Sequence, residues 1–139
     1  MKYGSLILEK KEYVYLKRIL NISGYAEDHE TQKCLMALAE ELKTAHIVDE
    51  EEMPYDIIRF NSKVKVVFES GLEKTMQLVI PMDKDVSKNK ISVLTPMGSA
   101  LIGYSNSDVI EWNFPNGKQK IKIAEVTQEE TFNGIDIVI

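Results

Sequence analysis

Apolar residues near the start of the chain recur with the period of an α-helix. Between Glu9 and Leu20 they occupy one helical face, at Tyr13, Leu16 and Leu20. A second stretch, from about Glu30 to Ala45, repeats this spacing in the a/d manner of a coiled coil at Leu35, Leu38, Leu42 and Ala45. Two striped helices with a short turn-forming connection most simply form an antiparallel hairpin. The pattern therefore predicts a short helical arm of about 20 Å.

The hydrophobic period changes to two after Pro54, which predicts β-strands. Alternating runs occupy residues 63–69, 76–80, 109–114 and 118–123, with a last short run at 135–139. Pro115-Asn116-Gly117 lies between two of these runs and is a strong hairpin signal. Trp112, on one of the strands, is expected either in the core or at the floor of a pocket.

Together these elements predict an α+β protein. We expect a helical hairpin over residues 1–52, as a short coiled-coil arm, and a largely antiparallel sheet domain with one short helix over residues 53–139.

The uncharged stretch TPMGSALIG, Thr95 to Gly103, raises the question of nucleotide binding. It follows the strand-like residues 91–94 and contains two glycines at the P-loop spacing. A P-loop needs Lys and then Ser or Thr after the second glycine, where this chain has Tyr104 and Ser105. The stretch is therefore not expected to bind phosphate.

The same stretch has the signals of a short helix packed on a sheet. Thr95 can cap the helix, Pro96 suits its first position, and Gly103 suits the position after its end. Met97 and Leu101, four residues apart, are expected to face the sheet.

Charge is distributed unevenly along the chain. Residues 1–56 contain seven basic and twelve acidic residues and so carry the whole net charge of −5, whereas residues 57–139 contain ten of each. An acidic chain without a basic stripe in its sequence is a poor candidate for direct nucleic-acid binding, because phosphate neutralisation supplies most of that affinity. A partner with a basic surface, or a metal, fits better.

Location follows from the apolar runs and the cysteine content. No run approaches the roughly 20 residues of a membrane helix, and the N-terminal residues do not form a secretory signal. The single Cys34 suits a reducing compartment, and we expect a cytoplasmic protein.

Few residues suggest catalysis or metal binding. His29 and His46 are too far apart in the pattern to share a metal, and Cys34 lacks the setting of an activated thiol. Three acids lie near the expected helical turn, at Glu27, Asp28 and Glu30. They could hold magnesium with help from a partner, or one of them could cap the second helix. We expect no catalytic residue, no cofactor and no metal site belonging to this chain alone.

A family resemblance rests on three spaced motifs. Residues 91–103, ISVLTPMGSALIG, are followed by Asp108-Val109-Ile110 and then by Pro115-Asn116-Gly117. This arrangement resembles the C-terminal domain of the Gre transcript-cleavage factors. Residues 51–54 (EEMP) and 57–62 (IIRFNS) are similar to the short-armed Rnk type within that family, the regulator of nucleoside diphosphate kinase.

The resemblance implies an FKBP-like sheet domain that docks on bacterial RNA polymerase near its secondary channel, with the helical arm pointing inward. It assigns docking roles to Thr95, Pro96, Met97 and Asp108, although the first three residues could simply start a helix. Gre arms end in D-x-x-E, acids that help the polymerase hold a second magnesium for RNA cleavage. The corresponding turn here, residues 26–30, reads AEDHE and lacks that motif.

The expected function is therefore that of a polymerase-binding regulator that is not an enzyme. It would compete with Gre factors without stimulating cleavage, and Glu27, Asp28 and Glu30 would contact the channel. One alternative is an FKBP-like prolyl isomerase or chaperone, which needs an aromatic-lined pocket. A second alternative is a true cleavage factor that uses the acids of the turn.

Overall fold

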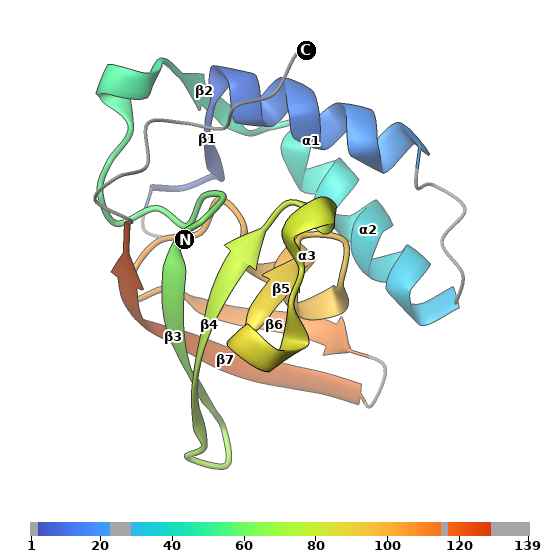
Figure 1. Ribbon diagram of the computed structural model, residues 1–139, viewed down its shortest axis with the longest axis vertical. Coiled ribbons are helices and arrows are strands. Elements are labelled where there is room, and N and C mark those ends of the chain that lie inside the picture. Colours follow the sequence, from blue (N-terminus) through green and yellow to red (C-terminus); the bar gives the residue numbers. More distant parts are fainter. Residues whose placement is uncertain (1–2, 23–28, 115–116, 129–139) are drawn as a thin grey trace.

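The computed structural model describes residues 3–22, 29–114 and 117–128, without the side chains of residues 112–114. Figure 1 shows a curved sheet with helices packed above and beside it. Glu27, Asp28, the Trp112 side chain and the strand expected at 135–139 lie outside this part. Within it, no helix combines the length and apolar character needed to cross a membrane.

The two long helices of the sequence pattern are both present. Helix α1 spans Lys10–Ile22 and α2 spans His29–Leu42. The stripe positions are buried as expected, at Leu16, Leu20, Leu35, Leu38 and Leu42. These leucines belong to the same apolar cluster as the buried residues of the sheet, so the helices share one core with the sheet. The boundary between residues 52 and 53 stays a prediction.

Over the residues that the structure describes, the main sheet has five strands in the order β5-β4-β3-β7-β6. Their bounds are β3 Lys63–Phe68, β4 Glu73–Val79, β5 Lys90–Ser92, β6 Val109–Phe114 and β7 Gly117–Thr127. The hairpin expected at the Pro-Asn-Gly signal is confirmed by the antiparallel pairing of β6 with β7.

The expectation of an antiparallel sheet is wrong at one edge, because β5 pairs parallel to β4 and the sheet is mixed. Two short 3-10 turns, η2 (Pro81–Asp83) and η3 (Val86–Lys88), connect these strands. They return the chain to the level of Gln77 before β5 begins, so that β5 runs beside the last three residues of β4. Whether two strands run parallel depends on how the chain crosses between them. Alternating apolar residues predict a strand but do not indicate its direction.

A second, two-stranded sheet joins the beginning and the end of the helical segment. Strand β1 (Ile7–Glu9) pairs in parallel with β2 (His46–Val48), and each is only three residues long. The sequence pattern did not indicate this pairing, because strands of three residues show no measurable period.

The stretch from Thr95 to Gly103 forms the capped helix that its sequence predicts. Helix α3 spans Pro96–Leu101, and the Thr95 hydroxyl accepts a hydrogen bond from Gly98 N at 3.0 Å. Gly103 follows the helix with φ of +84°, a conformation that favours glycine. Leu101 is buried, and Met97 packs partly buried against the core.

Gly98 is required at its position by the close approach of β5 to α3. A Cβ atom there would lie 2.2 Å from the carbonyl oxygen of Ser92. We expect Gly98→Ala to lower the free energy of unfolding by about 1–3 kcal/mol, as overpacking does. Helix propensity alone predicts the opposite effect, a rise of about 1 kcal/mol in the free energy of unfolding. Urea denaturation measures the difference.

A matched control is Ala39→Gly on the exposed face of α2, which should cost only about 1 kcal/mol through propensity. If Gly98→Ala stabilised the protein, the close approach of Ser92 and Gly98 would not exist in solution.

Candidate functional site

The segment that begins α3 is held by hydrogen bonds at both of its ends. Thr95 Oγ1 donates to the Ser92 carbonyl at 2.7 Å while it caps Gly98 N. Ser99 Oγ donates back to the Pro96 carbonyl at 2.9 Å. Thr95, Pro96 and Met97 are half-buried, so each presents part of its surface to solvent. The structure thus places these three candidate residues together on one hydrogen-bonded turn.

Asp108 lies after α3, in the turn that leads into β6, and points inward. Its Oδ2 accepts hydrogen bonds from Ser105 N and Ser105 Oγ, both at 2.9 Å, and the residue is 7% exposed. Its carbonyl also accepts from Ile123 N on β7. Asp108 therefore holds the turn, and its role in docking stays a prediction.

Of the three acids expected at the arm turn, only Glu30 lies in the described part. It occupies the first turn of α2 and is half-buried. Negative charge at that position is favourable toward the helix N-terminus.

The main buried polar cluster lies between α1 and the sheet domain and was not predicted. Arg59 donates from Nε to Glu12 Oε2 at 2.9 Å, and its Nη2 contacts the same oxygen. It also donates to both carboxylate oxygens of Glu50, from Nη1 at 2.6 Å and from Nη2 at 2.8 Å. Arg59 thereby joins α1 to η1 (Glu50–Glu52) through the segment that precedes β3.

The remaining polar atoms around Arg59 are also paired. Glu12 Oε1 accepts from Phe60 N at 3.1 Å. Glu9 accepts from the backbone N of Lys11 and Glu12, at 3.0 and 3.1 Å, and so caps α1. The Phe60 ring packs edge-on against Tyr15 of α1, with ring centroids 5.7 Å apart.

Burial and pairing shift the ionisation of this cluster. Burial raises the pKa of Glu12 above its ordinary value, and the Arg59 hydrogen bond and charge reduce this rise only in part. Hydrogen bonding to Arg59 lowers the pKa of Glu50. Burial alone would lower the pKa of Arg59, but the two carboxylates outweigh it and raise that pKa, so Arg59 stays charged.

The three carboxylates of this cluster have the spacing of a metal site but already have a cation. One oxygen each from Glu9, Glu12 and Glu50 lies within 4.8 Å of the others. Arg59 lies between Glu12 and Glu50, and Glu9 accepts from the helix N-terminus. The chemistry of the cluster is therefore that of a structural ion pair.

A second polar contact joins α2 to the sheet domain. The Tyr104 hydroxyl lies 3.0 and 2.9 Å from the two carboxylate oxygens of Glu41. Burial raises the pKa of Glu41, and this hydrogen bond opposes the rise.

The family model and the relatives that match this chain all belong to the transcription elongation factors. Residues 44–128 match the family model described as transcription elongation factor, GreA/GreB, C-terminal. The chain is 36% identical over 121 residues to a transcription elongation factor GreA of Acetivibrio thermocellus, covering 86% of this chain and 71% of that protein. It is 40% identical over 95 residues to a GreA of Clostridium botulinum, covering 68% of this chain and 59% of that protein.

A solved structure extends the similarity to the fold. It is described as a prokaryotic transcription elongation factor GreA/GreB from Nitrosomonas europaea and superposes with a TM-score of 0.69 at 34% identity. The alignment covers 89% of this chain and 98% of that chain, and so includes helices as well as sheet.

The Arg59 cluster makes a strong prediction for stability. Arg59→Met would leave the buried Glu12 carboxylate without its cation, and we expect a loss of about 3–5 kcal/mol. Adding Glu12→Gln should recover part of this loss, because the uncharged amide oxygen can still accept from Phe60 N. Denaturant unfolding of the single and double variants measures both effects. Lys63→Met on the exposed surface should change stability by only about 0.5 kcal/mol, and failure of Glu12→Gln to recover stability would contradict the assignment.

Glu50 makes a prediction about pH. Because its folded-state pKa is lowered, its contribution is complete above the unfolded pKa of about 4.3 and is lost as pH falls through the folded value. Since Glu50 is half-exposed, we expect Glu50→Gln to cost at most about 1 kcal/mol at pH 7. The difference from the parent protein should shrink toward pH 3 in acid-unfolding curves. Glu51→Gln, in the same turn, is the control and should show little effect at either pH.

Proposed function

The chain belongs to the GreA/GreB family of transcription elongation factors, and on this premise we propose that it binds bacterial RNA polymerase and regulates transcription in the cytoplasm. The observation that carries the proposal is the family match over residues 44–128, which spans the whole five-stranded sheet and the start of α3. The chain spans 71% and 59% of the two GreA proteins compared above, so their full activity is not assumed for it.

We place the docking surface at the start of α3. Thr95, Pro96 and Met97 are partly exposed, and their backbone is fixed by Ser92 and Gly98. A prearranged turn loses little conformational entropy on binding, which favours its use as a contact. Asp108 contributes by holding the turn between α3 and β6, since its carboxylate is engaged by Ser105.

We further propose the Rnk type, an FKBP-like domain with a short arm that does not stimulate transcript cleavage. Helices of 13 and 14 residues are about 20 Å long, and their buried leucines pack into the core of the sheet domain. Little of their length can then extend toward a distant active site. The protein would act by occupying the site where a Gre factor docks, and would not be an enzyme.

A cleavage factor is the second candidate, favoured by family membership and by Glu30 in the first turn of α2. In that case Glu27, Asp28 and Glu30 would contribute oxygen ligands to a magnesium ion held mainly by the polymerase. Adding the purified chain to a backtracked elongation complex separates the two functions. Unchanged RNA length, together with inhibition of an added Gre factor, is the expected result, and rapid RNA shortening would establish the second candidate.

The docking surface predicts a binding defect. Pro96→Lys with Met97→Glu should weaken binding to core RNA polymerase about tenfold or more, because charge replaces the apolar contact. Met36→Glu, on the exposed face of α2, is the control and should bind normally. Circular dichroism and thermal unfolding check that both variants fold. Normal binding of a folded Pro96 and Met97 variant would refute the docking surface, and no binding by the parent chain would refute the function.

A further inference from the structure

Strand β2 has one edge that no described residue occupies. In a parallel pair, alternate residues of a strand bond to the same neighbour. His46 N donates to the Leu6 carbonyl at 2.7 Å, so His46 and Val48 face β1, and the N–H and C=O groups of Ile47 face away from it. Among the described residues, β2 pairs with β1 alone, and no hydrogen bond of the loops and turns involves Ile47. This edge can therefore accept another strand.

Ile47 also exposes apolar surface beside this edge. Its side chain lies on the same face of the small sheet as that of Leu8, because directly paired residues point to one face. Leu8 is 1% exposed and belongs to the apolar core, whereas Ile47 is 38% exposed. Two strands of three residues form a marginal sheet, which a third strand stabilises. A strand with apolar residues on this face would cover Ile47.

The described part of the chain ends close to the segment that follows β2. Gln128, the residue after β7, donates from Nε2 to the Ile57 carbonyl at 2.7 Å, and its Oε1 accepts from Ser62 Oγ at 2.7 Å. Ser62 Oγ in turn accepts from Arg59 N at 2.9 Å, and the Arg59 side chain reaches Glu50. These contacts link Gln128 to η1, which begins two residues after β2.

The residues after Gln128 have the pattern of a strand. Ile135, Ile137 and Ile139 alternate with Asp136 and Val138, which favours a strand with one wholly apolar face. The six residues 129–134 can span about 20 Å, enough to pass η1 and reach β2. Two acids in this link pass the exposed acids of η1, but charges at the surface are screened and interact weakly.

The two outer strands of the main sheet are less suitable for these residues. The outer edge of β5 is already occupied, because Lys90 exchanges both backbone hydrogen bonds with Asp85, at 2.9 and 3.0 Å. Strand β6 begins level with Lys122, which lies five residues, or about 17 Å, before Thr127 along β7. From there β6 runs farther away from Thr127, so a link of six residues would reach only its beginning.

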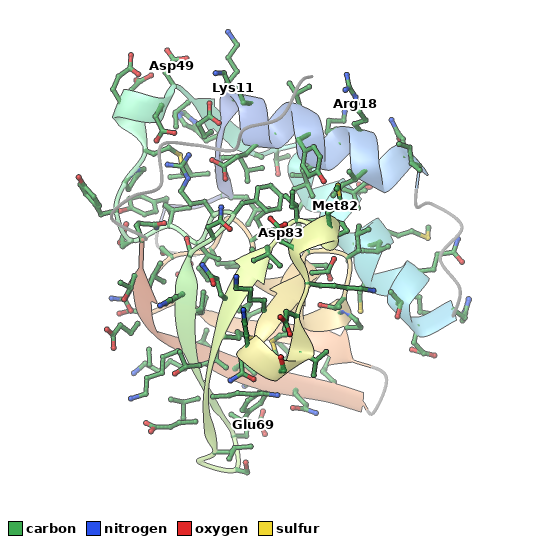
Figure 2. All side chains as sticks on the ribbon, viewed as in Figure 1. Lys11, Arg18, Asp49, Glu69, Met82 and Asp83 are labelled. Carbon is green, nitrogen blue, oxygen red and sulfur yellow. The ribbon has the colours of Figure 1, made fainter. Side chains whose placement is uncertain are left out.

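The unpaired part of β4 lies at the opposite end of the molecule from β2. Strand β5 pairs with Gln77–Val79, so residues 73–76 have no neighbour on that side within the described part of the chain. They follow the turn that contains Glu69. Figure 2 shows Glu69 at the end of the molecule opposite Asp49, which directly follows β2. Of these edges, that of β2 is the one that residues 135–139 reach most readily.

We propose that residues 135–139 of the same chain bind to the open edge of β2 as a third strand. The link arrives from the side of η1, at the end of β2, so the added strand runs antiparallel to β2. Its three isoleucines share the face of Ile47 and Leu8, and its backbone pairs with the N–H and C=O groups of Ile47. The added strand ties the end of β7 to the base of the two helices. This contact is independent of any binding to RNA polymerase.

Amide hydrogen exchange at Ile47 tests the added strand. In the full chain the Ile47 N–H should exchange about tenfold or more slowly than in a variant that ends at Gln128, because the added strand supplies its acceptor. The Ile7 N–H donates to the Gly103 carbonyl and is the internal control, with equal exchange in both chains. Ile137→Pro in the full chain removes a donor from the added strand and should speed exchange at Ile47 in the same way.

Disulfide cross-linking identifies the residues that meet. In a Cys34→Ala background, which removes the single natural cysteine, Ile47→Cys is combined with one further cysteine at each position from 135 to 139. A disulfide within one chain should form fastest at the positions that share the face of Ile47, with Ile135→Cys, Ile137→Cys or Ile139→Cys. It should form about tenfold or more slowly on the opposite face, with Asp136→Cys or Val138→Cys, because their Cβ atoms point away.

A matched control pairs Leu72→Cys with Ile137→Cys. Leu72 is 62% exposed but lies in the turn after Glu69, and this pair should stay reduced under the same conditions. A disulfide that joins two chains, seen as a doubling of the 15.9 kDa mass, would assign the edge to a second copy and overturn the proposal. Equal exchange at Ile47 in the full and the shortened chain would overturn it as well, and so would equal cross-linking rates on the two faces.

Discussion

The arrangement of helices on sheet depends on the ion pair network around Arg59. This side chain comes from the segment before β3, and it reaches a buried carboxylate on α1 and a half-exposed one on η1. Glu12 lies 47 residues before Arg59 and Glu50 nine residues before it, and only the relative positions of these elements allow one guanidinium to bind both acids. Apolar packing, such as that of Tyr15 on Phe60, also attracts α1 to the sheet domain here. Such packing tolerates small shifts of the helix relative to the sheet. The directional hydrogen bonds of Arg59 favour one orientation, because any shift would leave Glu12 buried without its cation.

The spacing of apolar residues and the turn residues predicted the helices and the β6–β7 hairpin well. The leucines of α1 and α2 follow the period of a helix, and the cap, proline and glycine of α3 each occupy the position their chemistry favours. The β6–β7 hairpin follows from its turn residues in the same way. Each of these features can be recognised from the spacing of residues close in sequence. The direction of β5 cannot, since it depends on how the chain crosses between β4 and β5.

The polar residues of the candidate site were the hardest to predict. Glu12 stands in a run of lysines and glutamates that is typical of a solvated helix face, yet it is almost fully buried because Arg59, 47 residues later, supplies its counter-charge. Asp108, expected to take part in docking, has a carboxylate oxygen engaged by Ser105 within its turn, a partner that its sequence position did not indicate. A sequence shows that a residue is charged, but its burial depends on a partner that the fold brings from elsewhere.

The parallel pairing of β1 with β2 has a consequence for how such proteins change in evolution. Because paired strands lie about 4.8 Å apart, the chain enters and leaves the helical segment at nearly the same point. The segment between Glu9 and His46 therefore starts and ends at this two-stranded sheet. Turns of helix can be added to or removed from its far end in matched pairs without moving the sheet. One scaffold can in this way carry arms of many lengths, and the reach of the arm can vary independently of the surface that anchors it.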